Sequence, residues 1–296
     1  MRGRHVTRED IVLKLAESGY VADGPLATSL QIMQLIGRPL LVEGEAGVGK
    51  TQIAKALACA LGTRLIRLQC YEGLDQSTAL YEWNYQRQLL TIELQKTAAD
   101  RQQDLEAELF SERYLLERPL LAAIRQDSPP VLLIDEIDRA DEEFEAFLLE
   151  LLSDFQVTIP ELGTIRATSV PHVILTSNGT RDLSDALRRR CLYHYLDFPD
   201  AEREARIILA RIPGLSAQLA GQIASVVGQI RKEELSRNPG VAETLDWAAA
   251  LVGLNVSSLD GNHELAHETM LCLLKTNEDR QRISREVSAR IIGRAA

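Results

Sequence analysis

Short runs of apolar, β-prone residues alternate with segments of helical periodicity up to residue 199. The runs lie at 39–44, 64–70, 131–137, 172–178 and 192–198. Apolar residues recur at helical spacing after the first run, as Ile53, Leu57 and Leu61, and after the third, as Phe144 and Leu148. Strands that alternate with helices are typical of a mostly parallel sheet. The pattern therefore predicts an α/β fold with helices on both faces of the sheet.

The strand pattern stops after Pro199. Four segments with helical periodicity follow, at 201–212, 216–235, 242–253 and 264–275. We therefore predict two domains, an α/β core over residues 1–199 and an all-helical domain over residues 200–296.

Two segments interrupt the alternation within the core. The stretch from about residue 81 to residue 118 is rich in charge, and 98–113 in particular have the composition of a solvated helix, so we predict an insertion here. Residues 154–170 contain two β-branched runs around the turn residues Pro-Glu-Leu-Gly, which predicts a hairpin just before the strand at 172–178.

Composition narrows the class of protein. The 296 residues are 45% hydrophobic and 26% charged, which is ordinary for a globular protein and excludes a largely disordered chain. The formal net charge of −10 disfavours general binding to nucleic acid or to anionic membranes. The sequence has no apolar run long enough for a membrane span, and its four cysteines are scattered. We therefore expect a cytoplasmic protein without a transmembrane segment.

The strongest chemical signal is the segment GEAGVGKT at 44–51, which fits the pattern G-x-x-x-x-G-K-[ST] between a predicted strand and a predicted helix. Glycines let backbone N–H groups approach phosphates, and a helix amino terminus favours anions. Lys50 would reach the β- and γ-phosphates of ATP, and the Thr51 hydroxyl would bind Mg²⁺. The alternative is a glycine-rich turn with an incidental lysine.

Two acids end the apolar run at 131–137. Asp135 would hold Mg²⁺, directly or through water, and Glu136 would orient and deprotonate the attacking water. Asn178 ends the next strand, where its side chain would bind that water or the γ-phosphate, although asparagine is also a common turn residue.

Three arginines follow Asn178 along the chain, Arg188, Arg189 and Arg190. An arginine offered to a neighbouring subunit would stabilise transition-state charge, whereas the simpler reading is a set of cations at a helix carboxyl terminus.

Together GEAGVGKT (44–51), LLIDEID (132–138), ILTSN (174–178) and ALRRR (186–190) resemble the AAA+ ATPases. The predicted hairpin resembles the pre-sensor-1 insertion, and the segment at 71–118 the helix-2 insert, of the MoxR group. Residues 19–51, 70–90 and 240–247 resemble the CoxD-like branch, which is associated with maturation of molybdenum-copper carbon monoxide dehydrogenase and related molybdenum hydroxylases. The resemblance implies a P-loop AAA+ core followed by a helical lid domain.

The resemblance also assigns roles to residues. It implies that Asp135 and Glu136 are the Walker B acids, that Asn178 is sensor 1, and that Arg190 or Arg189 is the finger acting in trans. The Walker A residues that it implies for ATP binding are Gly44, Glu45, Ala46, Gly47, Val48, Gly49, Lys50, Thr51 and Gln52. Ala242 and Glu243 stand where many AAA+ proteins carry a sensor-2 arginine, so Arg237 is the nearby candidate for that role.

The same resemblance implies partners. A homo-oligomeric ring, commonly a hexamer, would bind ATP between its subunits. A protein with a von Willebrand factor A domain would accompany it and could hold it at a membrane. The client would be a molybdenum enzyme that is remodelled during cofactor insertion.

Three alternatives compete with this interpretation. Residues 263–267 fit H-E-x-x-H, with Glu286 as a conceivable third ligand, which would indicate a zinc metalloprotease. A nucleic-acid motor is the second, but the predicted hairpin carries one arginine against one glutamate rather than a basic cluster. The third is a scaffold that binds nucleotide without hydrolysing it.

Overall fold

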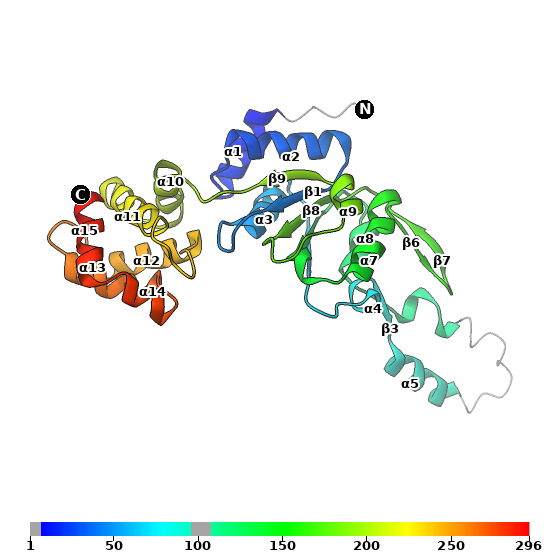
Figure 1. Ribbon diagram of the computed structural model, residues 1–296. Helices are drawn as coiled ribbons and strands as arrows, with labels where there is room; N and C mark the ends of the chain where they lie inside the picture. Colours follow the sequence, from blue (N-terminus) through cyan, green and yellow to red (C-terminus); the bar gives the residue numbers. More distant parts are fainter. Residues whose placement is uncertain (1–6, 96–107, 296) are drawn as a thin grey trace. The chain divides into compact units, whose positions relative to one another are not determined.

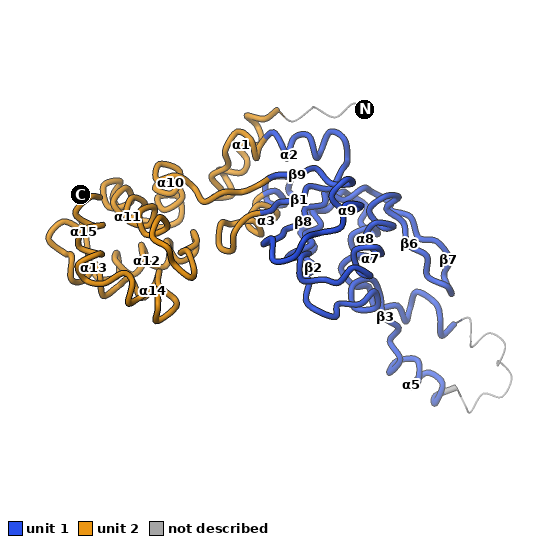
Figure 2. Tube along the Cα trace, viewed as in Figure 1, with its two compact units in different colours: residues 1–5, 28–43, 57–194 blue, residues 6–27, 44–56, 195–296 orange. Residues whose placement is uncertain are grey.

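The computed structural model describes residues 7–95 and 108–295 (Figure 1). Contacts group these residues into two compact units (Figure 2). Of the described residues, the first unit contains 28–43, 57–95 and 108–194, and the second contains 7–27, 44–56 and 195–295. The division into domains 1–199 and 200–296 stays a prediction.

The first unit is built on a five-stranded sheet. Its strands are β1 (Leu40–Glu43), β2 (Leu65–Gln69), β5 (Val131–Asp135), β8 (His172–Ser177) and β9 (Leu192–Tyr195). The order across the sheet is β2-β5-β8-β1-β9, and β2, β5, β8 and β1 pair in parallel. The five predicted strands and the α/β fold are confirmed. Since β5, β8 and β1 run parallel, their carboxyl ends lie at one edge of the sheet, where α/β proteins bind ligands.

Apolar helix faces cover this sheet. Helix α7 (Pro119–Ile124) packs against β2 and β5 through its buried residues, which include Leu120 and Ile124. Helix α8 (Glu142–Asp154) is capped at its amino terminus by Asp141, whose side chain accepts a hydrogen bond from the Phe144 N–H at 2.8 Å. Its helical-period residues Phe144 and Leu148 are buried in the same core. Two more helices belong to the fold, α3 (Lys50–Leu61) and α9 (Asp185–Arg190).

The two interrupting segments carry structure of their own. The segment 71–118 contains α4 (Gln76–Ala79), β3 (Tyr81–Trp83), α5 (Tyr85–Gln95), the short helix η1 (Glu112–Tyr114) and β4 (Leu115–Glu117). Strands β3 and β4 pair antiparallel, which the sequence pattern did not predict. Most of the solvated helix predicted at 98–113 lies outside the described residues. An antiparallel hairpin forms from β6 (Gln156–Ile159) and β7 (Gly163–Arg166).

The described residues after position 199 form helices and no strands, as predicted. The helices are α10 (Ala201–Arg211), α11 (Ala217–Ile230), α12 (Val241–Gly253), α13 (His263–Thr269), η3 (Met270–Cys272), α14 (Asn277–Arg282) and α15 (Arg285–Ala295). Trp247 lies fully buried in their core and its indole N–H donates to Thr269 Oγ1 at 2.9 Å. Two further helices, α1 (Arg8–Glu17) and α2 (Gly24–Ile36), come first in the chain. None of the described helices is long and apolar enough to cross a membrane.

Candidate active site

The predicted phosphate loop leaves the carboxyl end of β1 and ends at the start of α3. Gly47 and Gly49 have φ values of 83° and 101°, in the region that favours glycine. Lys50 is only 6% exposed, and its Nζ donates to the carbonyl oxygens of Gly44 and Glu45, both at 2.7 Å. Within the loop, the lysine therefore lies folded back over the backbone that would surround a phosphate.

The other predicted Walker A residues lie around this lysine. Glu45 and Ala46 are exposed, Val48 is buried, and Thr51 and Gln52 are half-buried in the first turn of α3. The Gln52 N–H donates to the Gly49 carbonyl at 3.1 Å, which closes the loop onto the helix. The sequence between Gly44 and Gln52 thus forms one continuous turn into a helix amino terminus, the backbone form that binds anions.

The outer side of the loop touches the first turn of helix α12. A Cβ atom placed on Gly240 would lie 2.7 Å from the Gly47 Cα and 2.8 Å from the Gly47 carbonyl oxygen. The Val241 N–H donates to that same oxygen at 2.9 Å, while the Glu243 carboxylate caps the helix by accepting from the Gly240 N–H at 3.1 Å. The loop and the helix therefore meet backbone to backbone.

A buried ion pair holds the turn before α12. The Arg231 guanidinium binds both carboxylate oxygens of Glu204, at 2.6 and 2.7 Å, and donates to the Pro239 carbonyl at 2.8 Å. The Thr244 hydroxyl also donates to Glu204, at 2.8 Å. Arg237, the sensor-2 candidate, is exposed. In this part of the chain, Arg231 is thus the arginine that supports the segment in contact with the phosphate loop.

We expect Gly240→Ala to weaken nucleotide binding. Its new methyl group would overlap the backbone of Gly47, and overpacking of this kind costs about 1–3 kcal/mol. If the loop shifts to relieve the overlap, the Kd for ATP should rise about tenfold or more. Titration with a fluorescent ATP analogue measures this. Gly253→Ala is the matched control, because a Cβ at the far end of α12 meets nothing within 4 Å; equal affinities of the two variants would contradict the prediction.

In the first unit, the candidate acids lie at the end of β5. Asp135 is 2% exposed, and its Oδ1 accepts from the Thr176 hydroxyl on β8 at 2.6 Å. Thr176 Oγ1 in turn accepts from the Glu136 N–H at 2.9 Å. A single hydroxyl therefore fixes the side chain of the first acid and the backbone of the second.

Glu136 has a left-handed backbone, with φ of 56°, and begins the short helix η2 (Ile137–Arg139). Left-handed non-glycine residues are uncommon and occur often at functional sites. The Glu136 side chain is 34% exposed and pairs with Arg139 at 3.1 Å. The turn thus separates the two neighbouring acids, since Asp135 points into the protein and Glu136 remains accessible to water.

Asp138 links this turn to Asn178. Its Oδ2 accepts from the N–H of Asn178 at 3.2 Å, and from the N–H and hydroxyl of Thr180 at 3.0 and 2.7 Å. Burial alone would raise the pKa of Asp138, but these hydrogen bonds lower it overall, so the carboxylate stays ionised. Asn178 itself is half-buried at the end of β8. Asp138 therefore positions the predicted sensor-1 residue.

The three arginines of α9 have different surroundings. Arg188 pairs with Glu43 at the end of β1, at 3.2 Å. Arg189 and Arg190 are exposed, and the Arg190 Nε donates to the Ser153 hydroxyl at 2.9 Å. Arg188 is thus engaged within its own chain, and the two arginines predicted as trans fingers lie at the surface.

The two histidines of the H-E-x-x-H segment lie on helix α13, with His267 in contact with α15, rather than in a cluster of metal-ligating side chains, within the described part of the chain. His263 starts α13, and His267 Nδ1 lies 2.8 Å from the Ser288 hydroxyl of α15. No group of three or more His, Cys, Asp or Glu residues suited to a metal ion occurs among residues 7–95 and 108–295. The pattern is therefore a helix surface whose second histidine packs against a neighbouring helix.

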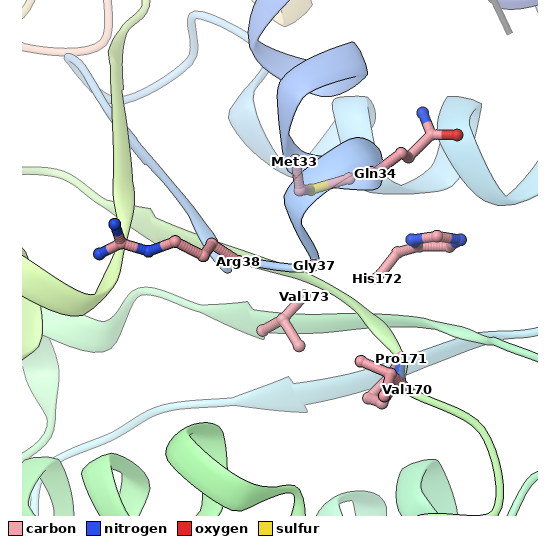
Figure 3. Close-up of a pocket in the computed structure, with 8 residues that line it drawn as sticks. All are labelled: Met33, Gln34, Gly37, Arg38, Val170, Pro171, His172 and Val173. Atoms are coloured by element: carbon pink, nitrogen blue, oxygen red, sulfur yellow. The ribbon is translucent and has the colours of Figure 1, made fainter. Parts of the chain in front are cut away.

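A pocket in the first unit lies at the opposite end of β8 from Asn178 (Figure 3). It is lined by Met33 and Gly37 at the end of α2 and by Val170 and His172 at the start of β8. Burial lowers the pKa of His172, so this imidazole is neutral at pH 7. The pocket contains none of the predicted site residues.

Sequence reasoning missed four residues that support the predicted site. Three are described above: Asp138, Arg231 and Gly240. The fourth is Arg67 on β2, whose Nη2 lies 2.6 Å from Asp135 Oδ2. Asp138 stands three residues after Asp135 in the quoted segment LLIDEID, but its role depends on a contact with the next strand of the sheet. Gly240 stands in the segment 240–247 that carries the resemblance, but its close contact with the Gly47 backbone leaves no local sequence pattern.

The chain is similar to several known proteins. The gas vesicle ATPase GvpN of Haloferax mediterranei is 24% identical over 269 residues, which cover 87% of this chain and 75% of GvpN. An uncharacterized protein of Staphylococcus haemolyticus is 28% identical over 232 residues, which cover 74% of this chain and 78% of that protein. Among solved structures, the Thermotoga maritima RuvB Holliday junction branch migration motor matches 90% of this chain and 69% of its own, with 17% identity and a TM-score of 0.46.

The family model described as AAA domain, dynein-related subfamily, matches residues 39–191. This span covers more than half of the chain and runs from β1 through the phosphate loop, both strand-end acids and Asn178 to the end of α9. The chain therefore belongs to the AAA ATPase family, within its dynein-related subfamily.

Proposed function

We propose that this protein is an ATPase that uses the loop 44–51 to bind the phosphates of Mg²⁺-ATP. The main observation behind this proposal is the conformation of the loop: Gly47 and Gly49 have positive φ, and the buried Lys50 donates to two carbonyl oxygens of the loop. Family membership and the sheet order support the proposal, because β8 and β5 are the strands that follow β1 across the sheet. Their ends carry Asn178, Asp135 and Glu136.

In this proposal, Glu136 accepts a proton from the attacking water. The water oxygen forms a bond to the γ-phosphorus while the bond to the bridging oxygen of ADP breaks. The partial exposure of the Glu136 side chain supports this role, since a general base must reach water. Asn178 would hold the same water or the γ-phosphate by a hydrogen bond. Arg190, or Arg189, would stabilise the transition-state charge from a neighbouring subunit.

The residues present fit a divalent cation. Arg67 Nη2 lies 2.6 Å from Asp135 Oδ2, so a cation already binds this buried carboxylate. Burial is the largest cause that raises the pKa of the Cys70 thiol to about 12, and the carboxylates of Asp135, Asp138 and Glu136 raise it further. Thr51 and Asp135 would hold Mg²⁺, which when bound neutralises charge on the phosphate oxygens.

The finer proposal concerns the biological role. We place the chain in the MoxR group and its CoxD-like branch, as a cytoplasmic chaperone that works as a ring, commonly a hexamer. A partner with a von Willebrand factor A domain would accompany it, and the client would be a molybdenum hydroxylase such as carbon monoxide dehydrogenase. The segments 19–51, 70–90 and 240–247 support the branch, and the similarity to GvpN supports the wider group.

Phosphate release with Mg²⁺-ATP, measured over a range of protein concentrations, tests the ATPase and the ring together. We expect the specific rate to rise with concentration, because Arg190 would complete the site of a neighbouring subunit, and we expect Lys50→Ala to abolish ATP binding and turnover. Arg190→Ala should lose turnover and keep ATP binding. Lys55→Ala, an exposed lysine on the same helix, is the matched control.

Other outcomes would favour other functions. ATP binding without phosphate release at any concentration, with and without candidate partners, would indicate a scaffold. Stimulation of turnover by single- or double-stranded DNA would indicate a nucleic-acid motor. Normal molybdenum-hydroxylase activity in cells that lack the gene would remove the client from the proposal and leave the ATPase.

A further inference from the structure

Arg67 on β2 lies directly beside the predicted metal ligand Asp135. Strands β2 and β5 are neighbours in the sheet, and their register sets Gln69 opposite Asp135. Because side chains alternate along a strand, Arg67 shares a face of β2 with Gln69 and reaches the same carboxylate. Its Nε and Nη2 bind Asp135 Oδ2 at 3.0 and 2.6 Å, and Nη2 also donates to Gln69 Oε1.

The two partners differ sharply in exposure. The Asp135 side chain is 2% exposed, whereas the Arg67 side chain is 47% exposed. Moving the Arg67 side chain fully into water therefore costs little free energy, whereas the Asp135 side chain is held in the protein interior. A buried carboxylate keeps its charge best with a cation beside it, and a guanidinium and a divalent cation both meet that need. The two cations would then compete for Asp135 Oδ2.

We propose that Arg67 is a positioning residue that competes with Mg²⁺ for Asp135 and so sets the Mg²⁺ concentration at which nucleotide binds. The inference rests on the proposed function, in which Asp135 holds the metal. In the metal-free protein Arg67 occupies Oδ2, and it leaves that oxygen when Mg²⁺-nucleotide binds. The arginine thereby weakens metal binding and favours the release of Mg²⁺ with the product.

A purely structural ion pair predicts something different. Loss of a structural pair would lower the thermal stability of the protein and leave the Mg²⁺ requirement unchanged. An arginine that instead binds ATP phosphate directly would, when removed, weaken nucleotide binding with and without metal. Of these three roles, competition alone predicts that removal of the Arg67 charge lowers the Mg²⁺ requirement, so the sign of the change separates them.

The test measures binding of a fluorescent, non-hydrolysable ATP analogue to the full chain as Mg²⁺ is titrated, in wild type, Arg67→Met and Arg67→Lys. Methionine keeps an unbranched apolar stem like that of the arginine and lacks the charged guanidinium. We expect the half-saturating Mg²⁺ concentration to fall about three- to fivefold in Arg67→Met, as for a partly exposed ion pair. Arg67→Lys, which keeps the charge, should stay within about twofold of wild type. Analogue affinity in excess EDTA should not increase in either variant.

The control is Arg64→Met, which removes an exposed arginine just before the same strand and should leave the Mg²⁺ curve unchanged. If wild type binds Mg²⁺-nucleotide but Arg67→Met shows an unchanged or higher Mg²⁺ requirement, the proposed competition is wrong. An equal fall in Arg64→Met would overturn it as well, because the effect would then come from net charge. If wild type binds no nucleotide with Mg²⁺, the proposed function fails and this inference fails with it.

Discussion

Glu136→Gln is expected to stop ATP hydrolysis while ATP binding is retained. Glutamine keeps the shape of the side chain and its hydrogen bonds but cannot accept the proton of the attacking water. Loss of a general base lowers turnover about 100- to 10,000-fold. The left-handed backbone at residue 136 depends on the hydrogen bond from its N–H to Thr176, which the substitution leaves in place. Phosphate release and analogue binding, measured on the same preparation, separate the two effects.

Glu142→Gln is the matched control for this prediction. Glu142 is an exposed glutamate in the first turn of α8, only six residues further along the chain, and it forms no hydrogen bond or ion pair with a candidate site residue within the described residues. Turnover of Glu136→Gln close to that of Glu142→Gln would show that the proton is accepted elsewhere. Loss of analogue binding in Glu136→Gln would instead show that Glu136 holds the nucleotide.

The second large effect is expected from Glu204→Ala in α10. The Glu204 and Arg231 side chains are 1% and 7% exposed, and removal of one partner leaves a buried charge, which costs about 3–5 kcal/mol. The Arg231 guanidinium also lies 4.4 Å from the centre of the Phe198 ring, so little water can replace the lost carboxylate. We therefore expect a large fall in the free energy of unfolding of the helical region.

Denaturant unfolding followed by tryptophan fluorescence measures this change. The chain has two tryptophans, so a Trp83→Phe background leaves Trp247, in the core of the helical region, as the reporter. Glu202→Ala, an exposed glutamate on the same helix, is the matched control and should change stability by less than about 0.5 kcal/mol. A similarly small change for Glu204→Ala would mean that the ion pair contributes nothing net.

The strands and the phosphate loop could be predicted because their signals are local. The apolar runs at 131–137 and 172–178 form β5 and β8, and the glycines that the loop needs stand within the motif itself. The chemistry of these strand ends, with acids and an asparagine, follows from the same short segments.

Contacts between distant segments could not be predicted in this way. In the sequence, Arg67 has the pattern of an ordinary exposed strand residue. Its position beside Asp135 follows only from the register of β2 and β5 in the folded protein. Gly240 reads as a helix cap, and only the folded chain shows the Gly47 backbone against it. Strands β3 and β4 are three residues each and pair across a charged insertion, so neither has the length or pattern that indicates a strand.

Because Gly240 contacts the Gly47 backbone, helix α12 is attached to the phosphate loop at its amino-terminal end, and a tilt about that end would move its other end. Its 13 residues span about 20 Å at 1.5 Å per residue, with the phosphate loop at one end. A tilt of about 10° at Gly240 would therefore move the far end by about 3 Å. Trp247 packs the middle of α12 into the helical core, so the helices packed against α12 would move together with α12.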